Sequence, residues 1–316
     1  MGQNRCVKVL ITGGAGFIGS CLADHLFAQG AEVRVLDDLS TGLRSVVSRD
    51  IEFIEGDIAD PATVTKAMRQ VEVVYHQAAH RSVFRSVESP LSTDRVNVGG
   101  TLSVLLAARD AGVRRVVAAS SSSVYGNDVA LPTPESAVPR PRSPYAVSKL
   151  AGEHYCRVFW ELYGLETVSL RYFNVYGPRQ RADGQYATVI PLFIDAVRSG
   201  RAVELHGDGT QSRDFTFIDD VVSCNVAAAT APAERCAGDV FNVAGGSPVS
   251  VLGVLDAVAQ ALGVTPVVER QPPRAGDVAH THADLSSVHA QLGWLPQTPF
   301  EVGIERTVAW FASHQA

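Results

Sequence analysis

The chain has 316 residues, of which 46% are hydrophobic and 19% charged, a composition typical of a globular protein with one large or two coupled domains. A net charge of −6 and the lack of a long basic run argue against nucleic acid as a main partner. No apolar run approaches the ~20 residues that span a bilayer, and no signal peptide is evident. Five scattered cysteines form no Cys-x-x-Cys pair, so we expect a cytoplasmic protein without a disulfide framework or a metal site.

In the first half of the chain, apolar runs alternate with helical patterns. Strands are predicted at 7–12, 32–37, 51–55, 72–76, 115–120 and 166–171. Helices are predicted at 16–29, 61–69, 91–112 and 145–163. Because the strands are apolar throughout, the pattern predicts an α/β fold, with a Rossmann-type doubly wound parallel sheet covered on both faces.

After Tyr172 the composition changes. Residues 177–187 are rich in Gly, Pro, Arg and Gln and predict a loop. A helix at 188–199, strands at 202–205 and 238–243 and a helix at 250–262 follow. Residues 266–279 carry three prolines and two arginines, which favours an ordered binding loop.

Three glycines, Gly13, Gly16 and Gly19, stand between the first strand and the first helix. Such glycines let backbone amides approach a pyrophosphate, and the helix N-terminus adds positive potential. A tight turn alone would explain them, but Asp37 ends the second strand about 20 residues on, as a dinucleotide site expects. A carboxylate there accepts from ribose hydroxyls and repels a 2′-phosphate, which favours NAD over NADP. Asp57 with Ile58 either holds the adenine or caps the next helix.

Tyr145 and Lys149 lie four residues apart on a predicted helix and therefore share a face. A cation beside a phenol lowers its pKa from about 10 toward neutrality, where tyrosine can act as a base. Four serines at 120–123 end the preceding strand, at the sheet edge where ligands bind. One of them can hydrogen-bond the same substrate oxygen as Tyr145, whereas others cap the strand end. A dinucleotide and a lowered-pKa tyrosine together indicate hydride chemistry on a hydroxyl or carbonyl.

Two arginines in the second half, Arg213 and Arg274, occupy separate predicted loops. They could bracket a diphosphate through charge-assisted hydrogen bonds. On residue type alone, exposed surface arginine is an equally good interpretation.

Several motifs together resemble the extended short-chain dehydrogenase/reductases, and among them the nucleotide-sugar 4-epimerases, along nearly the whole chain. The motifs are Gly-Gly-Ala-Gly-Phe-Ile-Gly at 13–19, His-Gln-Ala-Ala at 76–79, Asn-Val-Gly-Gly-Thr at 97–101, Ser121 with Tyr125-Gly126, Tyr-Ala-Val-Ser-Lys at 145–149, Arg-Tyr-Phe-Asn-Val-Tyr-Gly-Pro-Arg-Gln at 171–180 and Ser-Arg-Asp-Phe at 212–215.

The resemblance implies a role for each matching residue. Ser121, Tyr145 and Lys149 would be the catalytic trio. NAD would contact Gly13, Gly16, Phe17, Ile18, Gly19, Asp37, Asp57, Ile58, Gln77, Ala78, Ala79, Asn97, Tyr145, Lys149 and Tyr172. The nucleotide sugar would contact Arg81, Ser82, Ser121, Ser122, Asn174, Arg181, Val189, Arg213, Arg274, Asp277 and Thr281. We expect an NAD-binding domain at 1–174 plus roughly 214–246, and a smaller C-terminal substrate-binding domain at 175–213 plus 247–316.

Four positions bear on the reaction and the sugar. Relatives that dehydrate or decarboxylate carry acidic residues where this chain has Ser122 and Ser123, so plain epimerisation is favoured. Arg181 is typical of UDP-glucuronate epimerases, whereas residues 186–191 follow the neutral-sugar pattern, which we prefer. Thr281 is small, where a tyrosine in relatives excludes N-acetyl groups.

By this resemblance we expect an NAD-dependent 4-epimerase of UDP-hexoses that works through a transient 4-keto sugar. Its substrates would be UDP-glucose and UDP-galactose together with UDP-GlcNAc and UDP-GalNAc. A UDP-glucuronate 4-epimerase is the first alternative, and a nucleotide-sugar dehydratase or reductase the second. A non-catalytic scaffold is disfavoured because Tyr145 and Lys149 are both present.

A homodimer is expected as well, because in relatives the counterparts of helices 91–112 and 145–163 pair as a four-helix bundle. Candidate seam residues are Leu102, Leu105, Leu106, Phe159 and Leu162.

Overall fold

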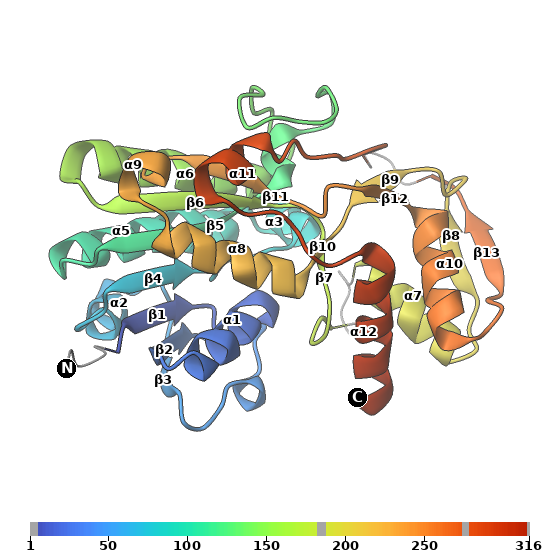
Figure 1. Cartoon of the computed structure of the whole chain (residues 1–316), viewed down its shortest axis with the longest axis horizontal. Helices are drawn as coiled ribbons and strands as arrows, with labels where there is room; N and C mark the ends of the chain where they lie inside the picture. Colours follow the sequence, from blue (N-terminus) through green and yellow to red (C-terminus); the bar gives the residue numbers. More distant parts are fainter. Residues whose placement is uncertain (1–5, 182–187, 274–277, 315–316) are drawn as a thin grey trace.

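Seven parallel strands form the central sheet, in the order β11-β6-β5-β4-β1-β2-β3 (Figure 1). The structure is a computed structural model that describes residues 6–181, 188–273 and 278–314. The strands are β1 (Lys8–Thr12), β2 (Glu32–Asp37), β3 (Glu52–Glu55), β4 (Val73–His76), β5 (Arg115–Ser121), β6 (Glu166–Tyr172) and β11 (Val240–Val243). This order and direction confirm the predicted doubly wound α/β fold.

Helices cover both faces of the sheet, as its apolar strands require. On one face α1 (Phe17–Ala28) and α8 (Ile218–Thr230) pack over Val9 and Ile11 of β1. On the other, α2 (Pro61–Ala67), α5 (Thr101–Asp110) and α6 (Pro144–Tyr163) pack over Leu10 of the same strand. The alternation of neighbouring residues between two core clusters follows from the two-residue period of a strand.

The predicted helix over 91–112 is not continuous. It consists of α4 (Pro90–Asp94), a π-helical segment η2 (Arg95–Gly100) and α5, and is preceded by α3 (Val83–Glu88). A π segment inserts an extra residue into the helical turn and commonly marks functional sites. Here it carries Asn97, whose carbonyl accepts a hydrogen bond of 2.5 Å from the Thr101 hydroxyl.

Helix α6 begins sharply, which fixes the first turn that carries Tyr145. Ser143 is its N-cap and accepts from the Ala146 amide at 3.1 Å, with Pro144 at the first helical position. Gly164, with φ +69, ends the helix in the left-handed conformation that suits glycine.

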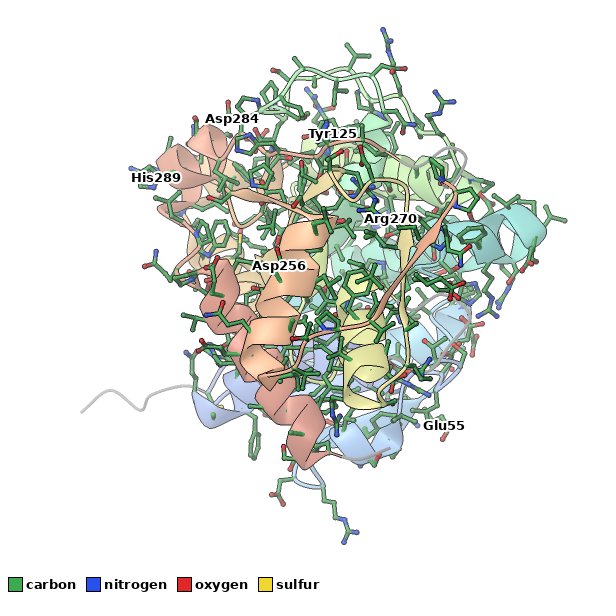
Figure 2. All side chains as sticks on the ribbon, turned by 90° about the vertical axis from the view of Figure 1, so that its right-hand side faces the viewer. Glu55, Tyr125, Asp256, Arg270, Asp284 and His289 are labelled. Carbon is green, nitrogen blue, oxygen red and sulfur yellow. The ribbon has the colours of Figure 1, made fainter. Side chains whose placement is uncertain are left out.

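A smaller region lies at one end of the sheet, on the right in Figure 1. It contains α7 (Val189–Arg198), β8 (Val203–His206), β9 (Ser212–Asp214), β12 (Pro248–Ser250), α10 (Val251–Leu262), β13 (Val268–Gln271) and α12 (Phe300–Ser313). Figure 2 turns this region toward the viewer, with Asp256 on α10 and Arg270 on β13.

The prediction that 266–279 is entirely a loop is wrong, because β13 pairs in parallel with β8. The signal was weak since the strand is mostly exposed and lacks apolar alternation: its residues read Val-Glu-Arg-Gln. The remaining short elements are η1 (Arg44–Val46), η3 (Ser122–Tyr125), β7 (Val175–Tyr176), β10 (Thr216–Phe217), α9 (Ala233–Cys236) and α11 (Ser286–Leu292). Within the described ranges, no helix combines the length and the apolar character that crossing a membrane demands.

Candidate active site

A cavity of about 1050 Å³ runs along the carboxyl ends of the sheet strands. The ends of β2, β4, β5 and β6 contribute Asp37, Gln77, Ser121 and Tyr172 to its wall. From β1 the chain adds β2 and β3 on one side of the sheet, and it then crosses to add β4 on the other side. The cavity lies at this reversal of strand order, the switch point where doubly wound sheets bind ligands.

The glycine loop after β1 packs backbone against backbone. A Cβ on Gly13, which has φ +71, would lie 2.7 Å from the Ala78 backbone, and one on Gly19 would lie 2.2 Å from the Gly13 carbonyl oxygen. Gly16 is the N-cap of α1 and lines the cavity. The cradle therefore needs glycine and presents a helix N-terminus to the cavity, which fits a dinucleotide pyrophosphate.

Asp37 ends β2 in a buried position within the cavity wall. Its carboxylate accepts from the amides of Ala15 and Leu39, both at 2.9 Å. Burial raises the pKa of this carboxyl, while the two amide bonds act in the opposite direction. Asp37 thus links the glycine loop to the end of β2.

Asp57 and Ile58 line the same cavity. Asp57 does not cap the following helix: Asp60 does so, accepting from the Ala62 amide at 3.1 Å. Instead Asp57 forms a 2.8 Å ion pair with Arg95. The capping alternative for Asp57 is therefore corrected.

The end of β4 is tied to the end of β6 by a polar group in which Gln77 and Tyr172 were predicted as NAD contacts and Asn225 was missed. Gln77 Nε2 donates to the Tyr172 hydroxyl and to Asn225 Oδ1, both at 3.1 Å, and Asn225 Nδ2 donates to the Tyr172 hydroxyl at 2.9 Å. Asn225 lies on α8, fully buried, and no spacing in the sequence connects it to the other two. Gln77 and Tyr172 line the cavity beside Ala78 and Ala79, and Asn225 holds them from behind.

Ser121, Tyr145 and Lys149 come together in the cavity. Ser121 ends β5 and hydrogen-bonds the Tyr145 phenol, while Lys149 Nζ donates to the Ala119 carbonyl at 2.8 Å. Two neighbouring elements therefore carry the trio: β5 carries Ser121, and α6 carries Tyr145 and Lys149.

The charges around the trio include one that sequence reasoning had not placed beside the phenol. Burial raises the pKa of Tyr145, and the Ser121 hydrogen bond and the positive charge of Arg81 oppose that rise. Arg81 is thus a cation that acts on the phenol, and sequence reasoning had not connected it with Tyr145. Burial lowers the pKa of Lys149 to about 8.

Most predicted substrate contacts line the cavity. Those that do are Arg81, Ser121, Ser122, Asn174, Arg181, Arg213 and Thr281. Three other predicted residues contribute nothing to its wall. Ser82 caps α3, Val189 begins α7, and Asn97 is buried, bonding His80 and Ser148. Arg274 and Asp277 lie outside the described residues.

Asn174 and Thr281 are held together at the substrate end of the cavity. The Thr281 hydroxyl accepts from the Asp214 amide at 3.0 Å and from Asn174 Nδ2 at 3.4 Å. The buried Asp214 carboxylate in turn accepts from the amides of Gly246 and Ala283, at 2.9 and 3.0 Å. Asn174 Nδ2 also donates to the Asp214 carbonyl at 2.9 Å, so four segments distant in sequence meet at Asp214, through its carboxylate and its backbone.

Two further cavity residues were absent from the predicted site. Ser123 Oγ is buried without a hydrogen-bond partner among the described residues, and so is Arg179 Nη1. Arg179 Nη2 pairs with Asp24 on α1 at 2.6 Å. The run of four serines was a usable signal for Ser123, whereas nothing in the sequence linked Arg179 to α1.

Comparison with known proteins agrees with this geometry. The sequence profile of the "NAD dependent epimerase/dehydratase family" matches residues 9–244. The chain belongs to this NAD-dependent epimerase/dehydratase family. Its cofactor is NAD, which the glycine cradle and Asp37 fit.

Members of the family resemble the chain over its full length. It is 43% identical to a UDP-glucose 4-epimerase of Mycolicibacterium smegmatis, with 96% of this chain and 98% of the relative covered. The Thermus thermophilus UDP-glucose 4-epimerase, solved with NAD, is 40% identical with a TM-score of 0.88, covering 97% and 99% of the two chains. The UDP-N-acetylglucosamine 4-epimerase of Methanobrevibacter ruminantium is 35% identical with a TM-score of 0.92, covering 98% and 99%.

Proposed function

We propose that this NAD-dependent nucleotide-sugar 4-epimerase interconverts UDP-glucose with UDP-galactose, and UDP-GlcNAc with UDP-GalNAc. The observation that carries the proposal is the Ser121–Tyr145 pair, which faces the same cavity as the glycine cradle. The names of the Mycolicibacterium and Methanobrevibacter relatives support these two sugar pairs.

Proton transfer at C4 falls to Tyr145. As a phenolate it accepts the proton of the C4 hydroxyl and later returns it, while Ser121 hydrogen-bonds the same oxygen. The charge of Arg81 favours the phenolate. NAD, held by the glycine loop, Asp37 and Lys149, supplies the hydride acceptor and donor for C4 when bound.

Ser122 and Ser123 support epimerisation over elimination. Both line the cavity directly after Ser121. Loss of water from a 4-keto sugar needs a general acid at the leaving group, and a serine hydroxyl is a far weaker acid than a carboxyl group. Both residues are instead suited to hydrogen-bonding sugar hydroxyls.

The experiment is direct incubation with UDP-glucose, UDP-GlcNAc and UDP-glucuronate, with NMR detection of the epimer inverted at C4. We expect turnover of the first two. Turnover of UDP-glucuronate alone would favour the alternative assignment, in which Arg181 faces the C6 carboxylate.

Arg181 Nη1 lies 3.4 Å from the Thr41 carbonyl, on the loop after β2. For the neutral sugars, Arg181→Ala should barely change the rate, because these sugars have no C6 carboxylate for the guanidinium to bind.

We also propose a homodimer through α5 and α6. Leu106 and Leu162, on these helices, are exposed by 37% and 68%. Leu105 and Phe159, by contrast, are buried in the protein's own core. The support is that α5 and α6 pack against each other and each exposes a leucine, as the paired helices of the relatives' four-helix bundle require. A monomeric mass in light scattering at micromolar concentration would refute the dimer.

A further inference from the structure

A buried ion pair lies directly behind the catalytic trio, and none of the steps above uses it. Arg171 on β6 donates to both carboxylate oxygens of Glu153 on α6, with Nε–Oε1 at 2.8 Å and Nη2–Oε2 at 2.7 Å. The two side chains are each 4% exposed. The Arg171 guanidinium also lies over the Tyr125 ring, 4.6 Å from its centroid.

The same carboxylate holds the strand that carries Ser121. Ser120 Oγ donates to Glu153 Oε1 at 2.5 Å, so Glu153 joins the end of β5 to α6. Ser120 precedes Ser121 in β5, and Glu153 lies one helical turn after Lys149. The network therefore spans the two elements that carry all three catalytic side chains.

Glu153 also shares a small polar cavity of about 10 Å³ with Lys149. Among the described residues that line it, Glu153 is the only carboxylate. The other titratable groups around Lys149 are neutral. His76 from β4 has its pKa lowered to about 3, Cys156 from α6 has its pKa raised to about 12, and the Tyr145 phenol has its pKa raised by burial.

Stability does not explain such a pair, because replacing a buried ion pair by apolar residues of similar volume is often neutral or stabilising. We propose that Glu153, held by Arg171, is a positioning residue that keeps Lys149 charged and holds Ser121 on β5 in register with Tyr145 on α6. This role rests on the proposed function, in which a charged Lys149 binds the cofactor beside Tyr145.

The direction of the effect follows from charge. Burial disfavours the ammonium form of Lys149, and Cys156 and the Glu153 carboxylate act in the opposite direction and raise the pKa. Because burial raises the pKa of the Cys156 thiol to about 12, the carboxylate that Arg171 holds is the group that supplies negative charge near neutral pH. Removal of the carboxylate therefore lowers the pKa of Lys149, and the amine loses its proton at a lower pH.

The protonation of Lys149 can be followed directly by NMR, because the chain has only three lysines: Lys8, Lys66 and Lys149. The protein is labelled with ¹³Cε-lysine, and the resonance missing in Lys149→Met identifies the catalytic lysine. Its titration is then followed in the wild type, in Glu153→Gln and in Glu153→Asp. This NMR readout needs no substrate, so it remains valid even if the proposed sugar specificity fails.

We expect Lys149 to titrate near pH 8 in the wild type. In Glu153→Gln the pKa of Lys149 should be about one unit lower than in the wild type, at the low end of the effect that a nearby opposite charge has on a pKa. Glu153→Asp keeps the negative charge, so Lys149 should titrate there as in the wild type. The variant should turn over substrate more slowly, because the shorter side chain holds Ser120 less firmly. The alkaline limb of kcat/KM should move with the NMR titration.

Identical Lys149 titration in the wild type and Glu153→Gln would overturn the proposal. So would a rate loss in Glu153→Gln that is equal at all pH values, because a merely structural role predicts that result. If Glu153→Gln fails to fold because Arg171 is left uncompensated, Glu153→Gln/Arg171→Met removes both charges and receives the same titration.

Discussion

At the scale of single residues, the site depends on how Tyr145 gains and loses a proton. Burial raises its pKa, and the compensation comes from the Ser121 hydroxyl and the Arg81 charge. Arg81 forms no hydrogen bond or ion pair with the described residues, which leaves its charge directed at the cavity. The phenol is therefore tuned by two neighbours from different strand ends.

Replacement of Tyr145 by phenylalanine tests this role. We expect kcat to fall by about 10²–10⁴, the usual cost of losing a general base. The content of bound NAD and the melting temperature should stay near the wild-type values, because the substitution keeps the ring and removes only the hydroxyl that hydrogen-bonds Ser121. Near-native turnover would show that Tyr145 is not the base.

Thr281 gives the second residue-level prediction. Thr281→Tyr should depress activity on UDP-GlcNAc and UDP-GalNAc more than on the plain hexoses, because a phenol ring competes with the acetamide for volume and overpacking costs about 1–3 kcal/mol. Thr281→Val is the matched control: it loses the hydrogen bonds to Asp214 and Asn174 without adding a ring. Equal losses on both sugar pairs in Thr281→Tyr would mean that Thr281 does not line the part of the cavity that holds the acetamide on C2 of the sugar.

At the scale of elements, the first turn of α6 is the most consequential, since Tyr145 lies in it. Ser143→Ala removes the N-cap bond to the Ala146 amide and should lower the free energy of unfolding by about 1 kcal/mol. Ser250→Ala removes the matching cap of α10, a bond of 3.0 Å to the Gly253 amide, and should cost a similar amount.

Urea unfolding and steady-state kinetics on the two variants separate stability from positioning. Only Ser143→Ala should lower kcat, because only α6 carries catalytic side chains. Equal kcat in both variants would argue that the cap has no influence on the catalytic turn.

The sequence predicted those elements whose signals are local. The buried strands are continuous apolar runs, and the glycine spacing identified the cradle after β1. The π segment at Arg95–Gly100, strand β13 and the Gln77–Tyr172–Asn225 group were not predictable, because each depends on tertiary neighbours rather than on a pattern along the chain. For the same reason the sequence did not connect Arg81, on the loop after β4, with the Tyr145 phenol.

At the scale of the whole molecule, burial of His76 couples folding to pH. Its ring lies between the hydroxyls of Thr12 and Thr101, at 2.7 and 2.9 Å, and burial lowers its pKa to about 3. The unfolded chain binds a proton at this residue near pH 6.5, but the folded protein does not. The contribution to stability is thus complete above pH 6.5 and is lost as the pH falls toward 3.

His76→Gln lacks this proton uptake. The difference in unfolding free energy between the wild type and His76→Gln should therefore shrink by about 2 kcal/mol from pH 6.5 to pH 5, at about 1.4 kcal/mol per pH unit. Urea unfolding at several pH values measures it. Asp37 and Asp214, whose carboxyl pKa values are raised, titrate in both proteins and cancel in the comparison. A difference that is constant with pH would contradict the assignment.

The meeting of four segments at Asp214 has a consequence for how the enzyme is made. During synthesis the glycine cradle emerges among the first residues, yet the partners of Asp214 at Gly246 and Ala283 leave the ribosome only near the end. Contacts so distant along the chain close late and slowly. A chain that ends before residue 283 therefore lacks one of the amides that hold the Asp214 carboxylate at the substrate end of the cavity, and it should be unable to turn over substrate.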